Sequence, residues 1–171
     1  MIDLYCSPKL SRINKALRTE REVQGWREAS LYHNKYTCVI SGRKYNLIVH
    51  HIKGFDTILQ EAVQELSSKK KLSSAWFREP WLTNELRDLF LMKHRDYGLG
   101  VTLHKKIHDE FHHRYGYHNN SNEQFEEFKS SITKERVEYL LAVPEPGDLI
   151  CSKCGKVAMI LFDDTCPKCS P

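Results

Sequence analysis

The sequence contains no apolar run approaching the roughly 20 residues that a helix needs to cross a lipid bilayer. It also lacks internal repeats and low-complexity tracts, and its first residues, Met1 to Cys6, do not follow the basic-then-apolar layout of a secretory signal. These absences argue against a membrane or secreted protein. We therefore expect an intracellular protein with no membrane partner.

The composition is that of a folded globular protein, with 40% hydrophobic and 28% charged residues in a chain of 171. This length accommodates one compact domain and a small appendage. The net charge of +4 is mildly basic, which is compatible with a polyanionic partner but does not identify one. Nine histidines in so short a chain are the more informative feature.

The stretch 36–52 predicts a β-hairpin. Two β-rich runs, 36–40 and 47–52, flank a turn built on Ser41 and Gly42, and the second run ends in His50 and His51. Neighbouring side chains on a strand point to opposite faces of the sheet. The two histidines therefore cannot share one task, and we assign one as a metal ligand and the other as a base.

Helices are predicted around this hairpin by apolar spacing and end signals. A surface helix over 12–24 covers it, with DNA phosphate binding by Arg12, Lys15 and Arg18 as an alternative role. A helical insert over 55–95 follows, then a helix over 104–115 that Gly116 terminates. Helices over 122–142 begin at a capping box formed by Ser121 and Gln124.

The helix over 104–115 carries histidines at metal-binding spacing. His108 and His112 are four residues apart, so their imidazoles lie one turn apart on the same face, and His104 precedes them by another four. With His50 as a third ligand, an ion would keep positions open to water and substrate, as catalytic sites do. His51 could then take a proton from a water aimed at phosphorus. An accidental pair of core histidines is the alternative.

The last 21 residues carry four of the six cysteines as two C-x2-C pairs after a Pro- and Gly-bearing linker at 144–148. This spacing predicts a tetrahedral structural zinc site in a small ribbon, with disulfides as the alternative. Three lysines make the ribbon basic, so it could grip DNA, cap the fold or dock a protein. The four zinc ligands are Cys151, Cys154, Cys166 and Cys169.

Several of these segments together resemble the HNH, or ββα-metal, endonucleases. The resemblance rests on Tyr36-Thr37-Cys38-Val39-Ile40-Ser41-Gly42, Leu47-Ile48-Val49-His50-His51-Ile52 and Gly100-Val101-Thr102-Leu103 with His108-x3-His112. The continuation His112-His113-Arg114-Tyr115-Gly116 with Asn119-Asn120-Ser121-x2-Gln124-Phe125 is similar to the phage and intron homing branch. The resemblance as a whole covers roughly residues 30 to 130.

The resemblance implies an α+β fold: a ββα-metal core with the helical insert, flanking helices and the zinc ribbon, divided into a nuclease domain at 1–143 and the linker and ribbon at 144–171. His51 would be the general base, and His50 and His108 would hold a divalent ion, with His112 as the third ligand. Magnesium or manganese is the expected ion, with zinc as an alternative. Cleavage would leave 5′-phosphate and 3′-hydroxyl ends.

The same resemblance implies double-stranded DNA as substrate, a monomeric enzyme without a small-molecule cofactor, and the host cytoplasm as location if a phage encodes it. For the stretch 69–71, a solvated turn is the alternative to phosphate contact. The basic residues we expect to contact DNA are Arg43, Lys44, Lys69, Lys70, Lys71, Lys105 and Arg114.

Two positions depart from the family pattern. The asparagine that orients the base histidine in relatives would fall at Leu99. Many relatives also hold the fold with a zinc bound by two C-x2-C pairs, of which only Cys38 remains here, with Ser41 in place of its partner and His104 and Ile107 at the second pair. We expect packing to replace that zinc. The competing function is a non-catalytic, zinc-containing DNA-binding or regulatory protein.

Overall fold

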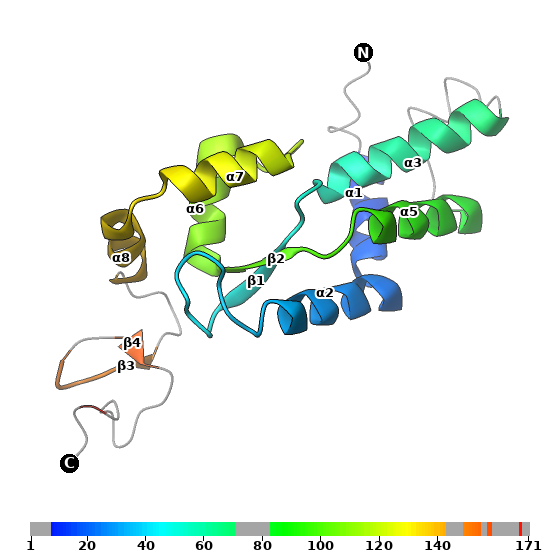
Figure 1. Cartoon of the computed structure of the whole chain (residues 1–171). Coiled ribbons are helices and arrows are strands. Elements are labelled where there is room, and N and C mark those ends of the chain that lie inside the picture. Colours follow the sequence, from blue (N-terminus) through cyan, green and yellow to red (C-terminus); the bar gives the residue numbers. More distant parts are fainter. Residues whose placement is uncertain (1–7, 71–82, 143–148, 155–156, 159–167, 169–171) are drawn as a thin grey trace.

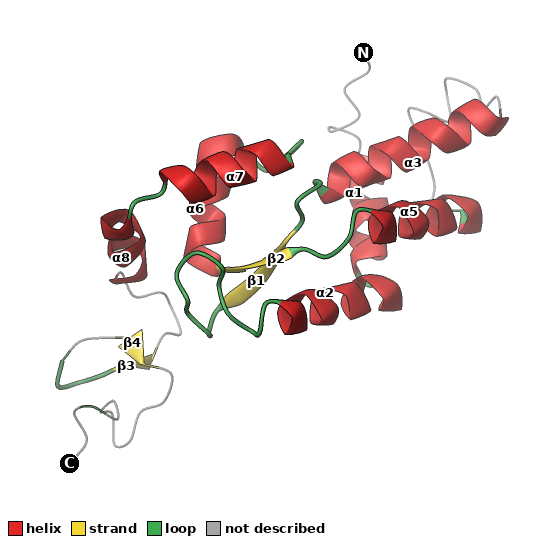
Figure 2. Ribbon diagram, in the orientation of Figure 1, coloured by secondary structure: helices red, strands yellow, loops and turns green. Residues whose placement is uncertain are grey.

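The structure, a computed structural model, describes residues 8–70, 83–142, 149–154, 157–158 and 168. The fold is α+β, mostly helical, with a small two-stranded antiparallel sheet between two groups of helices, α1, α2, α3 and α5 on one side and α6, α7 and α8 on the other (Figures 1 and 2). No helix in the described ranges is long and apolar enough to span a membrane.

The sheet joins two strands that lie about fifty residues apart in the chain. Strand β1, Leu47–His50, pairs with β2, Val101–His104, and the register places His50 opposite Val101. Helix α6, Lys105–Tyr115, follows β2 directly and contacts both strands. The described core therefore has the order strand, strand, helix, with the helical insert between the two strands.

The predicted hairpin over 36–52 is wrong in its first half. Residues 36–46 form turns, and the run 36–40 is not a strand, although Val39 N donates a hydrogen bond to Thr102 O of β2 at 2.9 Å. Lys35, Tyr36 and Asn46 have φ of 54°, 50° and 48°, which bends the backbone away from an extended path. The second run is a strand, but it ends at His50.

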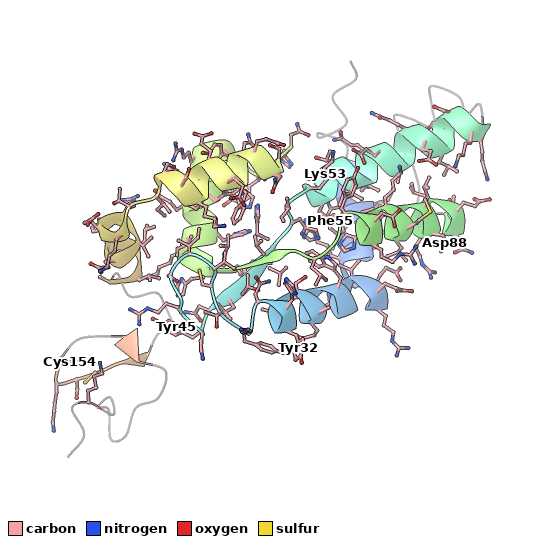
Figure 3. All side chains as sticks on the ribbon, in the orientation of Figure 1. Tyr32, Tyr45, Lys53, Phe55, Asp88 and Cys154 are labelled. Carbon is pink, nitrogen blue, oxygen red and sulfur yellow. The ribbon has the colours of Figure 1, made fainter. Side chains whose placement is uncertain are left out.

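The insert consists of α3, Phe55–Lys70, and α5, Asn84–Asp96, which pack against each other. Thr83 caps α5 by accepting a hydrogen bond from Leu86 N. Figure 3 shows Phe55 at the start of α3, where that helix meets α5. The buried residues of this first core are Ile13, Leu17, Val23, Phe55, Ile58, Leu59, Ala62, Val63, Leu66, Leu86 and Phe90.

The single surface helix expected over 12–24 is two helices, α1, Pro8–Arg18, and α2, Arg21–His33. The chain turns at Thr19 and Glu20. Ile13, Leu17 and Val23 are at most 5% exposed because they complete the core of the insert. These helices are therefore part of the packed structure and not a solvated cover.

A second core lies between α6, the turns at 36–46 and α7, Asn122–Ser131. Gly116, with φ 81°, ends α6, and Ser121 and Gln124 form the predicted capping box of α7. Helix α8, Lys134–Ala142, follows. Cys38 is only 1% exposed and belongs to the same apolar cluster as Ile107, so packing holds this part of the fold. The buried members are Cys38, Leu103, Ile107, Phe111, Phe125 and Phe128.

Near the C-terminus, β3, Leu149–Ile150, pairs with β4, Val157–Ala158. Cys151, at the end of β3, is buried, and Cys154 is exposed. The predicted linker at 144–148 and two of the four predicted zinc ligands, Cys166 and Cys169, lie outside the described residues.

Candidate metal centre and a second histidine pair

Three histidines converge between the sheet and α6. His50 is the last residue of β1, and His108 and His112 lie one turn apart on α6, which packs against that strand. One ring nitrogen of each lies within 4.8 Å of the others, and no further group of this kind occurs among the described residues. The three predicted ligands therefore lie together: helical spacing puts His108 and His112 on one face, and the packing of α6 against β1 brings His50 to them.

A hydrogen bond to the backbone fixes which nitrogen of His112 can act as a ligand. Nδ1 of His112 lies 2.7 Å from Gly116 O, and because a carbonyl only accepts, Nδ1 donates and Nε2 carries the lone pair. That Nε2 lies 3.1 Å from His108 Nε2. Two imidazole nitrogens bound to one ion at about 2.1 Å each are separated by about 3.0–3.4 Å, so this spacing suits shared coordination.

His50 presents a buried nitrogen toward the same place. It is 3% exposed, between Phe111 and Phe125, and its Nε2 has no hydrogen-bond partner among the described residues. A buried polar atom without a partner is costly, and a bound ion would satisfy it. Burial, helped by the neighbouring His108 and His112, lowers the pKa of His50 to about 3. Burial also lowers the pKa of His108, so both rings are neutral at pH 7, the form that binds metal.

His51, the next residue, lies among different side chains. Its ring stacks on Trp26 with centroids 4.1 Å apart, and its Nε2 is 3.0 Å from His94 Nε2. Phe55 meets it edge-on at 5.3 Å. Burial lowers the pKa of His51 well below 6.5, and charges at His94 and Arg18 lower it further. The two adjacent histidines therefore lie in different surroundings, His50 with His108 and His112, and His51 with Trp26, Phe55 and His94.

Trp26 and His94 are the residues that sequence reasoning missed here. Trp26, on α2, is anchored by a hydrogen bond from its Nε1 to Gly98 O at 2.7 Å. His94 lies in the last turn of α5, four residues after Phe90 on the buried stripe of that helix, and is 4% exposed. Its position on an apolar stripe was the only signal available from the sequence.

Gly100 lets these parts approach one another. A Cβ at this position would lie 2.6 Å from Val49 Cγ1, 2.7 Å from His50 O and 2.8 Å from Trp26 Cη2. Only glycine fits between strand and indole at these distances. Leu99, where the resemblance to HNH endonucleases would place an asparagine, is 40% exposed in the loop before β2, and its side chain carries no hydrogen-bonding group.

Most of the basic residues expected to contact DNA have acidic partners. Lys69 and Lys70 pair with Glu65 and Glu85 at 2.5 and 2.6 Å, and they end α3, about 20 Å along the helix from Phe55 at a rise of about 1.5 Å per residue. Lys71 lies outside the described residues.

The other expected contacts lie near α6 and the turns. Lys105 pairs with Asp109, and Arg114 with Glu127, each at 3.1 Å. Arg43 and Lys44 are exposed in the turn region, with the Arg43 guanidinium 5.9 Å from the centre of the Tyr45 ring.

A different cation adjoins the histidines. The Arg18 guanidinium lies 4.2 Å from the centre of the Phe55 ring, and its charge lowers the pKa of both His51 and His94. Burial lowers the pKa of Arg18 itself, with Asp56 acting in the opposite direction. Among the described basic residues, Arg18 is thus the one close enough for its charge to affect both His51 and His94.

No family model matches the chain. Neither a curated protein nor a solved structure is significantly similar to it.

Proposed function

We propose that the protein is a metal-dependent DNA endonuclease of the ββα-metal (HNH) kind, of the homing branch, with His51 as general base. One observation carries the proposal: His50, His108 and His112 converge on one point while the adjacent His51 is held separately. A purely structural metal site has no use for a second, separately oriented imidazole. The order of β1, β2 and α6 is consistent with this family.

The reaction assigned to these residues is hydrolysis of a phosphodiester bond. His51 removes a proton from a water molecule, the water oxygen forms a bond to phosphorus, and the bond from phosphorus to the 3′ oxygen breaks. The 3′ oxygen leaves with the electron pair and takes a proton from solvent. When bound, a divalent ion would stabilise the negative charge on the scissile phosphate and the leaving oxygen. The products carry 5′-phosphate and 3′-hydroxyl ends.

The donor set bears on which ion the site prefers. Neutral imidazoles suit zinc, nickel and cobalt, whereas magnesium takes oxygen ligands and keeps several waters. With three imidazoles from His50, His108 and His112, we place zinc ahead of the magnesium or manganese that the resemblance implies. Three protein ligands leave at least one position for substrate or water.

A phosphate contact is assigned to Arg18. Its guanidinium lies beside Phe55, which touches the His51 ring, so a phosphate bound there would lie next to the base. Among the described residues, Arg18 has no ion pair; its Nε donates to Asn14 Oδ1 at 2.7 Å. A guanidinium with spare donors suits a phosphate oxygen.

The second candidate is a non-catalytic, zinc-containing DNA-binding protein. The observation in its favour is Leu99, which offers no hydrogen-bonding side chain where relatives have asparagine. Under this alternative, the histidine cluster is a structural metal site, and the protein binds DNA without cutting it.

The test is cleavage of long duplex DNA by metal-stripped protein resupplied with Zn²⁺, Ni²⁺, Co²⁺, Mn²⁺ or Mg²⁺. We expect the wild type to cut and His51→Ala to cut about 10²–10⁴-fold more slowly, the usual contribution of a general base. His113→Ala is the matched control, because His113 is an exposed histidine on α6.

Two results would count against the proposal. DNA that the wild type binds but leaves intact with every ion would favour the second candidate. Cutting by His51→Ala at the wild-type rate would remove His51 as base. End-labelling of the products tests for the 5′-phosphate.

A further inference from the structure

His94 and His51 form a hydrogen-bonded imidazole pair outside the metal centre. Their Nε2 atoms are 3.0 Å apart, and the pair is enclosed by Trp26, Phe55 and Phe90. Two neutral imidazoles can share such a contact only if one nitrogen carries a proton and the other a lone pair. The contact therefore couples the tautomers of the two rings, because one Nε2 must be protonated and the other must carry the lone pair.

We propose that His94 is a positioning residue, which accepts a hydrogen bond from Nε2–H of His51 and so fixes Nδ1 as the nitrogen that takes up a proton. The inference rests on the proposed function of His51 as base. A base must present a lone pair to the water it activates, and a neutral imidazole has only one. With the Nε2 proton committed to His94, that lone pair is on Nδ1.

The surrounding contacts fix the His51 ring as well as its proton. Trp26 stacks on one face at an interplanar angle of 20°, and its Nε1 is tied to Gly98 O, which limits sliding of the indole. Phe55 meets the ring edge-on at 87°. Stacking sets the plane of His51, and His94 sets its rotation within that plane.

The location of His94 also suits this role. At 4% exposed, it cannot approach a DNA substrate directly, and it ends the buried stripe of α5. A histidine placed there only for packing could be replaced by phenylalanine, since its other neighbours are aromatic. A positioning role requires a hydrogen-bond acceptor at the place that Nε2 of His94 occupies. These two roles predict different results for the same substitution.

The direct test is nuclear magnetic resonance on ¹⁵N-histidine-labelled full-length protein. In the wild type, we expect a scalar coupling between the two Nε2 atoms across the hydrogen bond, with Nε2 of His51 protonated and Nδ1 unprotonated. In His94→Phe, we expect the coupling to vanish and His51 to populate both tautomers. The wild type lacking the coupling, or having its proton on Nδ1 of His51, would overturn the inference.

Kinetics supply the second readout. We expect His94→Phe to lower kcat about 100-fold, within the range that a misdirected base costs, while KM changes less than about 3-fold. His94→Gln, whose side-chain oxygen can accept the same bond, should recover most of the lost kcat. Unchanged kcat in His94→Phe, or equal losses in both variants, would contradict a positioning role.

The two arms separate this inference from the proposed function. A wild type that shows the coupling but cuts no DNA would refute the nuclease and retain the assignment of the His51 proton. A wild type that cuts DNA but lacks the coupling would refute the role of His94 alone. Circular dichroism of both His94 variants checks that they fold.

Discussion

The buried, neutral state of His50 makes the stability of the metal-free protein depend on pH. Burial lowers the pKa of His50 from 6.5 to about 3 in the folded chain, whereas the unfolded chain keeps the ordinary value. Between these two values the unfolded state binds a proton that the folded state does not. Above pH 6.5, His50 therefore does not lower the free energy of unfolding. As the pH is lowered from 6.5 toward 3, the free energy of unfolding decreases.

The size of this loss follows from the two pKa values. At pH 5, protonation lowers the free energy of the unfolded chain by about 2 kcal/mol relative to pH 7.5, while folded His50 is still almost entirely neutral. The slope approaches about 1.4 kcal/mol per pH unit over this range. A cost of this size is a large part of the stability of a small domain.

The assay is urea unfolding, followed by circular dichroism between pH 7.5 and 4.5 in the presence of a chelator. His50→Phe is the test variant, because the site already contains Phe111 and Phe125, and His33→Ala, at an exposed position, is the control. We expect the wild type and the control to lose about 2 kcal/mol more than His50→Phe between pH 7.5 and 5. Parallel pH profiles for the wild type and His50→Phe would refute the reasoning.

Three further predictions concern the metal, the glycine and the substrate contact. His112→Ala should weaken Co²⁺ binding at the histidine site, measured by absorption titration, by more than the roughly 10–100-fold that losing a ligand's hydrogen-bond partner costs, whereas His113→Ala should bind normally. Gly100→Ala should lower the free energy of unfolding by about 1–3 kcal/mol in chemical denaturation, because its Cβ would lie within 2.8 Å of three neighbouring atoms; normal stability would refute the close packing. Arg18→Met should weaken DNA binding and reduce the slope of log affinity against log salt concentration by about one phosphate contact. Lys69→Met, at the distant end of α3, should leave this slope unchanged. Equal effects of the two substitutions would refute the phosphate contact assigned to Arg18.

Local signals in the sequence were sufficient for most of the helices. The apolar stripe of α3, the cap at Thr83 and the capping box at Ser121 each depend on residues within one or two turns, and each is present in the structure. The strand pairing was not predictable in the same way. Residues 36–40 are β-rich, but β1 pairs with β2 about fifty residues away, and no short-range pattern encodes that partner.

Part of the candidate metal centre was predictable from local geometry, although the approach of β1 to α6 was not. Four-residue spacing fixes His108 and His112 on one face of a helix, and strand alternation separates His50 from His51. His94 gave no such signal, because on α5 it continues the stripe of Leu86 and Phe90, where a histidine is indistinguishable from an ordinary core residue. Its partner is a residue 43 positions earlier in the chain, and only the packing of α5 brings them together.

The two histidine groups therefore depend on different parts of the chain. The metal triad needs only β1 and α6, which belong to the strand, strand and helix unit. The surroundings of His51 come from Trp26 on α2, Phe55 on α3 and His94 on α5, all outside that unit. In the proposed enzyme, the insert and the N-terminal helices do more than stabilise the fold. They supply the side chains that surround and orient His51. A disturbance of the α3–α5 packing should therefore lower the rate of DNA cleavage while metal binding persists.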